Sequence, residues 1–214
     1  MIGSWSSYTI LAGKRVFQLT LIVLAASLLL SRLSYAAVGC TLNDPDRDVK
    51  RIFPESTGYR TEFIVIKDVG GEPLYRTIER ALGDTFDRVY ETIDVPYAFY
   101  DVLKGKEVIG HIHGVNQKGT YGGMQLILAT DLEGQIISFY YQKMSSPEAS
   151  KFMNTNFTAQ FIGLKREDFL NNTFSVNDPS KDSHDDFVAT LRGLKKNMIL
   201  FEELKRKTVT NLSI

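Results

Sequence analysis

The sequence predicts an α+β protein, in which helices pack against an antiparallel sheet that follows an N-terminal membrane or export segment. Three observations lead to this class. An apolar run follows two basic residues near the N-terminus, the hydrophobic period changes to two over residues 95–143, and an amphipathic pattern of helical period closes the chain. No internal repeat is visible, so we expect one domain beyond the N-terminal segment.

Composition narrows the possible partners. The chain has 214 residues, and its 25 Lys and Arg residues balance 25 Asp and Glu residues. A chain without net charge has no overall field that attracts a polyanion, so we expect no nucleic-acid partner. Hydrophobic residues make up 43% of the chain, which is ordinary for a globular protein able to bury its own core.

The N-terminus has the pattern that export machinery recognises. Lys14 and Arg15 precede an apolar run over residues 16–30. If this segment stays in the membrane, its basic flank favours a cytoplasmic N-terminus and an outward-facing domain. We therefore expect a protein of the cell membrane whose domain faces the periplasm or the outside.

Three fates of this segment remain open. A signal peptidase could cut after Ala36, where small residues stand at the key positions, or the segment could stay as a transmembrane anchor. Residues 37–40 also resemble the lipobox of a bacterial lipoprotein, which predicts lipidation of Cys40, although Ala37 stands where leucine is usual. Cys40 is the only cysteine, so one chain can form neither a disulfide nor a cysteine-based metal site.

The boundaries we expect are 1–40 for the export signal or anchor, 41–60 for a charged linker, and 61–207 for the domain. The domain begins with a strand over residues 61–67 and a turn over 68–71. A helix from Glu72 follows, with Gly83 as its C-cap. The spacing of Phe86, Tyr90 and Ile93 predicts a second short helix.

An antiparallel meander is predicted next, over residues 95–143. Its strands cover residues 97–103, 108–115, 124–130 and 135–143, and a hairpin turn falls at residues 131–134. After it, Pro147 suits the first turn of a short helix. The last helix covers residues 183–205, because Phe187, Leu194 and Met198 share one face and acidic residues stand at its start.

Two stretches could carry chemistry. Residues 116–123 hold three glycines between two strands, and the backbone N–H groups of such a loop can cradle an anion or a carbonyl-rich ring, or form a plain hairpin. His111 and His113 share one strand face and could chelate a metal, but no third ligand has suitable spacing, so we predict no metal site. The sequence has no hydrolase or nucleotide fingerprint, and we predict no catalytic residues.

The order of motifs resembles the FMN-binding domain family, which includes the flavin-carrying subunits of the Rnf electron-transport complex and of the sodium-pumping NADH:quinone reductase. The resemblance rests on residues 119–123, on the Asp-Leu-Glu-Gly-Gln-Ile turn at residues 131–136, and on the strands beside them. It implies an FMN cofactor with Thr120, Tyr121, Gly122 and Gly123 against the isoalloxazine ring. It also implies an anchored flavoprotein of electron transport whose partners are subunits of a membrane redox complex.

One motif departs from this family. Its members attach FMN through the phosphate to the threonine of Ser-Gly-Ala-Thr, just before the last helix. Here Ser180 and Ser183 stand at the first and last positions of that motif, with Lys181 and Asp182 between them. The charge of Asp182 and the bulk of Lys181 oppose covalent attachment, although a helix N-terminus favours a phosphate. Residues 145–148 likewise replace the family's Glu-Thr-Pro-Gly with Ser-Ser-Pro-Glu.

Two hypotheses follow. In the first, the chain is a membrane-tethered FMN-binding electron carrier, in which the cofactor performs the redox chemistry and the protein sets its binding and potential. In the second, the chain is a flavin-free binding or assembly module of the same fold, attached to a membrane redox complex. Both make it a carrier or binding module in place of a stand-alone enzyme.

Overall fold

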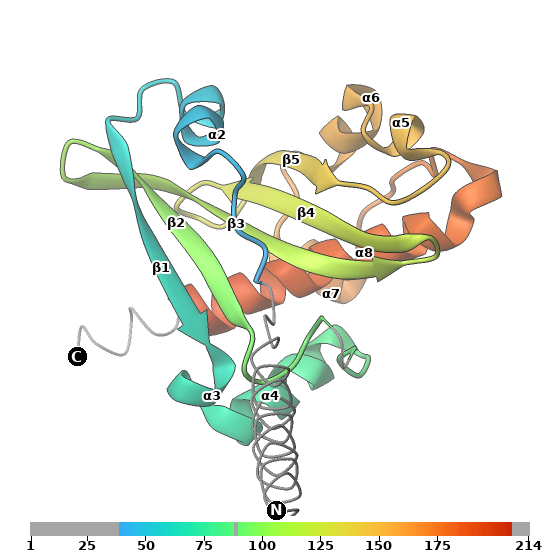
Figure 1. The fold of residues 1–214 in the computed structure, drawn as a ribbon, viewed down its shortest axis with the longest axis horizontal. Coiled ribbons are helices and arrows are strands. Elements are labelled where there is room, and N and C mark those ends of the chain that lie inside the picture. Colours follow the sequence, from blue (N-terminus) through green and yellow to red (C-terminus); the bar gives the residue numbers. More distant parts are fainter. Residues whose placement is uncertain (1–38, 88–89, 207–214) are drawn as a thin grey trace, which may run out of the picture. The chain divides into compact units, whose positions relative to one another are not determined.

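The computed structural model describes residues 39–87 and 90–206, which form a five-stranded antiparallel sheet with helices packed against it (Figure 1). The predicted α+β class is therefore confirmed for these residues. The expected export segment lies outside the described residues. Within the described part of the chain, no helix combines the length and the apolar character needed to span a bilayer.

The sheet is a meander in the order β1-β2-β3-β4-β5, with every neighbouring pair antiparallel. The four strands predicted over residues 97–143 are confirmed, and a strand that precedes them in the sequence extends the sheet beyond β2. The strands are β1 (Gly58–Val65), β2 (Pro96–Lys104), β3 (Glu107–Gly119), β4 (Gly122–Thr130) and β5 (Ile136–Lys143). The predicted turn between β4 and β5 is closed by the N–H of Gly134, which donates to the carbonyl of Asp131.

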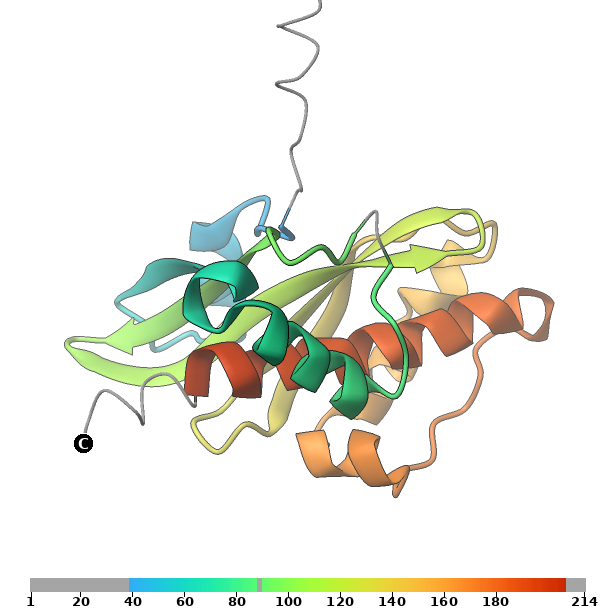
Figure 2. The same cartoon turned by 90° about the horizontal axis from the view of Figure 1, so that it is seen from below.

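One face of the sheet carries the larger core. The long helix α8 (His184–Leu200) lies along this face, and α4 (Gly71–Leu82) lies beside it (Figure 2). A π-helical turn, η4 (Phe201–Arg206), continues α8. Gly83 ends α4 in the left-handed conformation, with φ 77°, as its position predicts. The helix approaches the sheet closely at Gly193. A Cβ added there would lie 2.2 Å from Cδ1 of Leu126, so only glycine fits without a shift.

Short helices complete this side of the molecule. Three of them contribute Phe152, Phe157 and Phe161, whose rings pack edge to face. We did not predict α7, and Asn172 ends it in the left-handed conformation with φ 52°. These elements are α3 (Ile66–Val69), α5 (Ala149–Phe152), α6 (Thr155–Thr158), η2 (Ala159–Phe161), α7 (Arg166–Asn171) and η3 (Lys181–Ser183).

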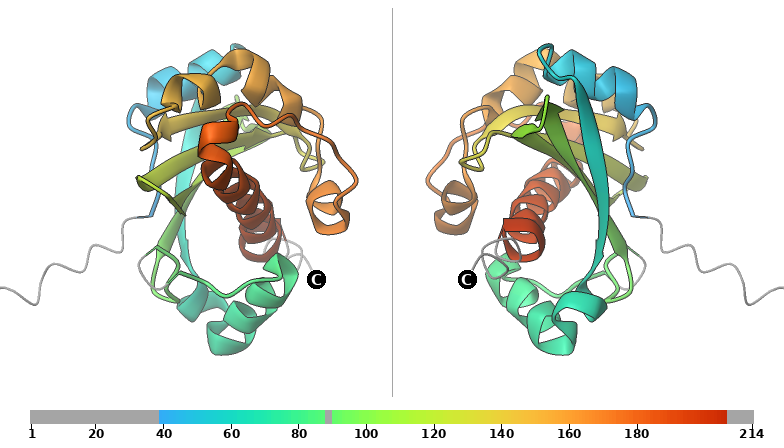
Figure 3. Two further views of the ribbon diagram at one scale, coloured as in Figure 1. Left: turned by 90° about the vertical axis from the view of Figure 1, so that its right-hand side faces the viewer. Right: turned by 90° about the vertical axis from the view of Figure 1, so that its left-hand side faces the viewer.

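The other face of the sheet is covered by residues that we expected to form a linker. Helix α2 (Pro45–Ile52) packs there, on the side of the sheet opposite α8 (Figure 3). Asp44 caps it by accepting a hydrogen bond from the N–H of Arg47. The charged residues that suggested a linker surround two buried apolar residues, Val49 and Phe53. The described fold therefore includes residues 39–60.

Two other expectations differ from the structure. The strand expected at residues 61–67 is β1, which begins and ends earlier, and α3 takes up its last residues. The second short helix expected after Gly83 is wrong for the described residues 84–87 and 90–95, which form turns. Phe86 and Val95 are buried all the same, so this segment contributes to the core without a regular period.

Candidate functional site

The glycine-rich turn and the start of the last helix, which the sequence predicts to share a site, lie against each other. The N–H of Thr120, in the β3–β4 turn, donates a 2.8 Å hydrogen bond to Oδ1 of Asp186 in the first turn of α8. A Cβ at Gly119 would lie 2.9 Å from the same oxygen, so the turn can approach this carboxylate because residue 119 is glycine. The predicted elements are therefore adjacent.

Side chains of the protein itself pack on the glycines of the turn. Gly122 has φ 137°, and a Cβ there would meet Cβ of Ser145 at 3.1 Å. The hydroxyl of Ser145 donates to the carbonyl of Gly123 at 3.0 Å. A Cβ at Gly123 would lie 3.3 Å from the hydroxyl oxygen of Tyr90. The space that the resemblance gives to a flavin ring thus borders on protein groups from two other segments.

Tyr121 differs from its neighbours in the turn. Its side chain is 56% exposed, which makes it a large apolar group in contact with solvent at the tip of the β3–β4 hairpin. An exposed aromatic ring with a polar tip suits contact with another molecule more than support of a buried ring.

The two serines expected at the phosphate lie in buried positions. Ser183 is 6% exposed and Ser180 is 4% exposed, and Oγ of Ser180 donates to Oε2 of Glu148 at 3.3 Å. The pKa of Glu148 is lowered, chiefly by a hydrogen bond from Lys151, so this carboxyl is ionised at neutral pH. The Ser-Ser-Pro-Glu stretch therefore reaches both the glycine turn, through Ser145, and the Ser180 position, through Glu148.

The charge at this place is unfavourable for an anion. Asp186 is fully buried, Asp182 stands in η3, and Glu148 contacts Ser180. The other carboxylate oxygen of Asp186, Oδ2, is buried and makes no hydrogen bond to any described residue. A phosphate placed at the start of α8 would gain from the helix N-terminus but would face these carboxylates at short range. The residues present do not fit a flavin attached at Ser183.

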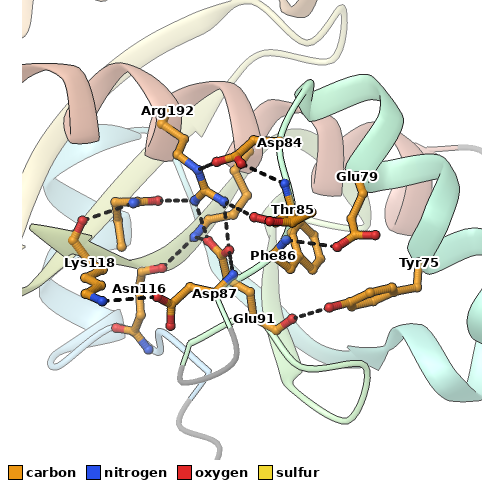
Figure 4. Close-up of polar contacts among 12 residues, drawn as sticks. Tyr75, Glu79, Asp84, Thr85, Phe86, Asp87, Glu91, Asn116, Lys118 and Arg192 are labelled. Atoms are coloured by element: carbon orange, nitrogen blue, oxygen red, sulfur yellow. Dashed lines mark hydrogen bonds and ion pairs between the residues drawn. The ribbon is translucent and has the colours of Figure 1, made fainter.

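A buried ionic network lies next to this turn, and the sequence reasoning missed it. Glu91 is 1% exposed, and Arg192 binds both of its oxygens (Figure 4). Lys196, also 1% exposed, bonds to Oε1 of Glu91 and to the carbonyl of Asn116. A pattern that was available in the sequence is the pair of cations at positions 192 and 196, four apart on one helix, which share a face.

Arg192 has no donor left for a ligand. Its five hydrogen bonds match the five N–H donors of a guanidinium group. Nε donates to Asp84, Nη1 donates to Glu91 and Gln117, and Nη2 donates to Glu91 and to the carbonyl of Thr85, at distances of 2.6 to 3.0 Å. The side chain therefore holds the 84–91 segment to α8 and β3 and is not an anion receptor.

The pKa shifts agree with a charged network. Burial alone would raise the pKa of Glu91, but hydrogen bonds from Arg192 and the charge of Lys196 outweigh it, so the pKa is lowered. Burial lowers the pKa of Lys196 to about 8, against the opposing effect of Glu91. We conclude that Glu91 is an anion at neutral pH and that its charge keeps most of the Lys196 ammonium protonated.

An open groove of about 680 Å³ runs beside this network. Val188, 50% exposed, is the large apolar side chain on its wall, and Lys118 faces Asp87 across a 3.6 Å ion pair. The groove is close to the predicted loop but is lined by none of residues 120–123, 180 and 183. Its lining comprises Asp84, Thr85, Phe86, Asp87, Gln117, Lys118, Asp185, Val188, Ala189 and Arg192.

The two histidines lie at the other end of α8 and face Phe201. Nδ1 of His111 is 2.9 Å from Oδ1 of Asp101, and Nδ1 of His113 bonds to Oδ1 of Asn197. His113 stacks on the ring of Phe201, with centroids 4.6 Å apart. Among residues 39–87 and 90–206, no group of three or more His, Cys, Asp or Glu residues is arranged to hold a metal.

Asp101 is the centre of this second polar group. It is 1% exposed and accepts hydrogen bonds from Arg60 at 2.6 Å and from Lys205 at 3.0 Å, besides its contact with His111. Burial would raise the pKa of Asp101, but the hydrogen bonds from His111, Arg60 and Lys205 hold it far below the usual range. These contacts tie β1, β2, β3 and η4 together.

Cys40, the predicted lipidation site, is 1% exposed. It belongs to the core on the face of the sheet that α2 covers, which we call the outer face.

No protein-family model matches this chain, and a search of curated proteins found no match. Any functional conclusion therefore rests on the geometry described above and on the sequence motifs.

Proposed function

We propose that this chain is an exported, membrane-tethered binding or assembly module that resembles an FMN-binding domain but carries no flavin. One observation carries the proposal: the buried carboxylate of Asp186 accepts the N–H of Thr120, between the glycine turn and the start of α8, where the resemblance would place the cofactor. A flavin phosphate or carbonyl would have to displace this bond and leave a buried carboxylate without its donor, which costs about 1–3 kcal/mol or more.

The neighbouring contacts support the same conclusion. Ser145 and Tyr90 pack on Gly122 and Gly123, and Glu148 lies on Ser180. The hydroxyl of Ser183 belongs to a residue that is only 6% exposed, so a transferase would reach it with difficulty. We infer that this region has become a closed structural junction between the β3–β4 turn and α8.

Under this proposal the outward surface supplies the function. Tyr121 and Val188 are exposed, and Val188 lies on the wall of a groove that carries both signs of charge. The tether is predicted from residues 14–38, which lie outside the described residues. The predicted partner is a subunit of a membrane redox complex, to which the tethered module would dock.

Flavin content of the full-length chain tests the proposal. The protein is produced in a bacterial host together with a flavin transferase, and visible absorbance and intact mass are measured on the detergent-purified chain. We expect a colourless protein with no flavin adduct. A flavin mass on Ser183 would overturn the proposal.

A series of variants distinguishes two reasons for a missing flavin, the altered attachment motif and the contact between Thr120 and Asp186. The triple change Lys181→Gly, Asp182→Ala and Ser183→Thr restores the attachment motif but keeps Asp186, so we expect it to gain little flavin. Adding Asp186→Ser frees the N–H of Thr120, and we expect flavin to appear. Asp185→Ser in the same triple background is the matched control, since it removes an exposed acid one position away.

The electron-carrier hypothesis is the second candidate. The observation that favours it is the contact between the glycine turn and the start of α8, since both are parts of the site that the resemblance implies. Flavin absorbance that survives denaturation in the wild-type chain would support this hypothesis. Flavin that is released by denaturation would support noncovalent binding in the adjacent groove.

A further inference from the structure

The first described residues form a strap, residues 39–43, across the outer face of the sheet. The N–H of Leu42 donates to the hydroxyl of Tyr100 at 3.1 Å. The N–H of Asn43 donates to Oε1 of Gln142 at 2.8 Å, and Nε2 of Gln142 donates to the carbonyl of Thr41 at 2.8 Å. Backbone groups of three successive strap residues are thus bound to β2 and β5.

Gly39 packs even closer to the sheet. A Cβ at this position would lie 1.8 Å from the carbonyl oxygen of Pro96, a distance that no side chain can occupy. Because the obstacle is a backbone atom, it cannot move aside like the end of a flexible side chain. The strap therefore depends on glycine directly before Cys40.

Cys40 fills a space in the core of the outer face. A Cβ at Gly114 would lie 2.9 Å from Sγ of Cys40, so the thiol lies directly on β3. Ile112, Ile127 and Tyr100 belong to the same buried cluster. Burial raises the pKa of the Cys40 thiol to about 12, so the group stays protonated and unreactive in the folded protein.

This placement conflicts with the product that a lipobox predicts. A lipoprotein carries a diacylglycerol group in thioether linkage to Sγ of its first cysteine, and two acyl chains cannot be accommodated beneath the strap. Modification precedes folding at the membrane, so burial would not prevent the reaction. The lipidated chain would instead have to leave Cys40 out of the core and give up the strap's hydrogen bonds.

We infer that Cys40 is a core thiol that stays unmodified in the mature protein, and that the membrane tether lies entirely N-terminal to the strap. This inference rests on the tethered part of the proposed function and is independent of flavin. A retained anchor is compatible with both the tether and the free thiol. Cleavage after Ala36 is compatible with the free thiol alone, because it removes the anchor but no strap residue.

Peptide mapping of the mature chain is the direct test. The full-length protein is produced in a bacterial host with intact lipoprotein processing, and its membrane and soluble fractions are analysed by mass spectrometry. We expect an unmodified Cys40 within a peptide that begins at or before Ala37. An N-terminal Cys40 that bears a diacylglycerol would overturn the inference while leaving the tether in place. A soluble chain with a free Cys40 would support the inference and contradict the tether.

One variant and one labelling experiment keep the test independent of peptide mapping. Cys40→Ala should stay in the fraction where the wild-type chain is found, whereas an accumulated precursor would contradict the inference. Maleimide should label Cys40 of the wild-type protein in urea but not in buffer, and a lack of labelling in both conditions would contradict a free thiol.

Gly39→Ala tests the packing of the strap without removing the lipobox-like motif, because alanine is also a small residue before Cys40. We expect its melting temperature to fall by about 5 °C or more. Gly58→Ala is the control, since an added Cβ there meets nothing within 4 Å. Equal melting temperatures for the two variants would show that the strap does not hold residue 39 against Pro96.

Discussion

Arg192 binds Glu91 end-on, with Nη1 2.8 Å from Oε1 and Nη2 3.0 Å from Oε2. Lys196 approaches the same carboxylate from the next helical turn. The three side chains join α8 to a segment that has no regular secondary structure in its described residues. The buried charges of Glu91, Arg192 and Lys196 therefore fix Glu91 against α8.

Removing one partner of this network should be costly. We expect Arg192→Ala to lower the free energy of unfolding by about 3–5 kcal/mol, because it leaves Glu91 buried with a single cation. Arg192→Lys should recover only part of the loss, since an ammonium cannot match the two-point geometry. Urea unfolding followed by circular dichroism measures both changes.

Arg76→Ala provides the comparison for this network. Its side chain is 58% exposed and pairs with Glu72 and Glu79 on the surface of α4, so we expect a much smaller loss than for Arg192→Ala. Similar losses for Arg76→Ala and Arg192→Ala would contradict the structural role of the buried network.

Asp101 should make the protein sensitive to acid. The pKa of Asp101 is lower in the folded than in the unfolded chain, where it is about 3.9. The stabilising effect of the ionised carboxylate is therefore complete above about pH 3.9, and it is lost as the pH falls from there through the folded pKa. We expect Asp101→Asn to lower the free energy of unfolding at pH 7 by about 3 kcal/mol. The difference from wild type should shrink below about pH 4. Urea unfolding at several pH values between about 7 and 3 measures both free energies. A difference between wild type and Asp101→Asn that does not change with pH would contradict this prediction.

His113 should affect stability at a higher pH. Burial lowers its pKa to about 3, and the hydrogen bond with Asn197 only partly offsets this effect. The unfolded chain takes up a proton near pH 6.5 and the folded chain does not, so stability falls as the pH drops below about 6.5. The slope from this residue approaches about 1.4 kcal/mol per pH unit.

The variant His113→Gln should reduce the change in the free energy of unfolding with pH between about pH 6 and pH 5, where carboxylates titrate little. His184→Gln is the control, because the side chain of His184 is 61% exposed at the start of α8. If both variants keep the wild-type slope, the buried imidazole is not the group that titrates on unfolding.

Gly193 should not tolerate alanine. Helix propensity favours Gly193→Ala by about 1 kcal/mol. The new Cβ, however, would meet Leu126, which is fully buried and cannot move aside. We expect overpacking to dominate and to give a net loss of about 1–2 kcal/mol in thermal or urea unfolding. Gly58→Ala supplies the reference, and a gain in stability at position 193 would contradict this close approach.

The periodic elements were predictable from the sequence because they depend on local pattern. Strands β2 to β5 are runs rich in apolar and aromatic residues between turn residues, and the apolar face of α8 repeats over several turns. Helix α2 was missed because Asp44, Asp46 and Asp48 suggested a solvated linker, although the spacing of Val49 and Phe53 gives one buried face. In a helix of eight residues, so few apolar positions give only a weak signal.

The candidate site was predictable only in part. Motif order predicted that the glycine turn and the start of α8 lie together. The hydrogen bond that joins them, from the N–H of Thr120 to Asp186, was not predicted because it depends on how the hairpin meets the helix. The partners of Arg192 could not be predicted, because Glu91 lies 101 residues away in a segment of turns. The spacing of Phe86, Tyr90 and Ile93 predicted a helix where ionic contacts impose another path.

The strap has a consequence for how the chain is made. Asn43 leaves the ribosome first, but its partner Gln142 follows 99 residues later, and the contact between Asp48 and Tyr140 spans 92 residues. The strap and α2 therefore cannot complete their contacts with the sheet until β5 has been synthesised, so Val49 and Phe53 reach their buried positions late. Folding of this layer is therefore controlled by the last strand of the sheet and not by the order in which its own residues are made.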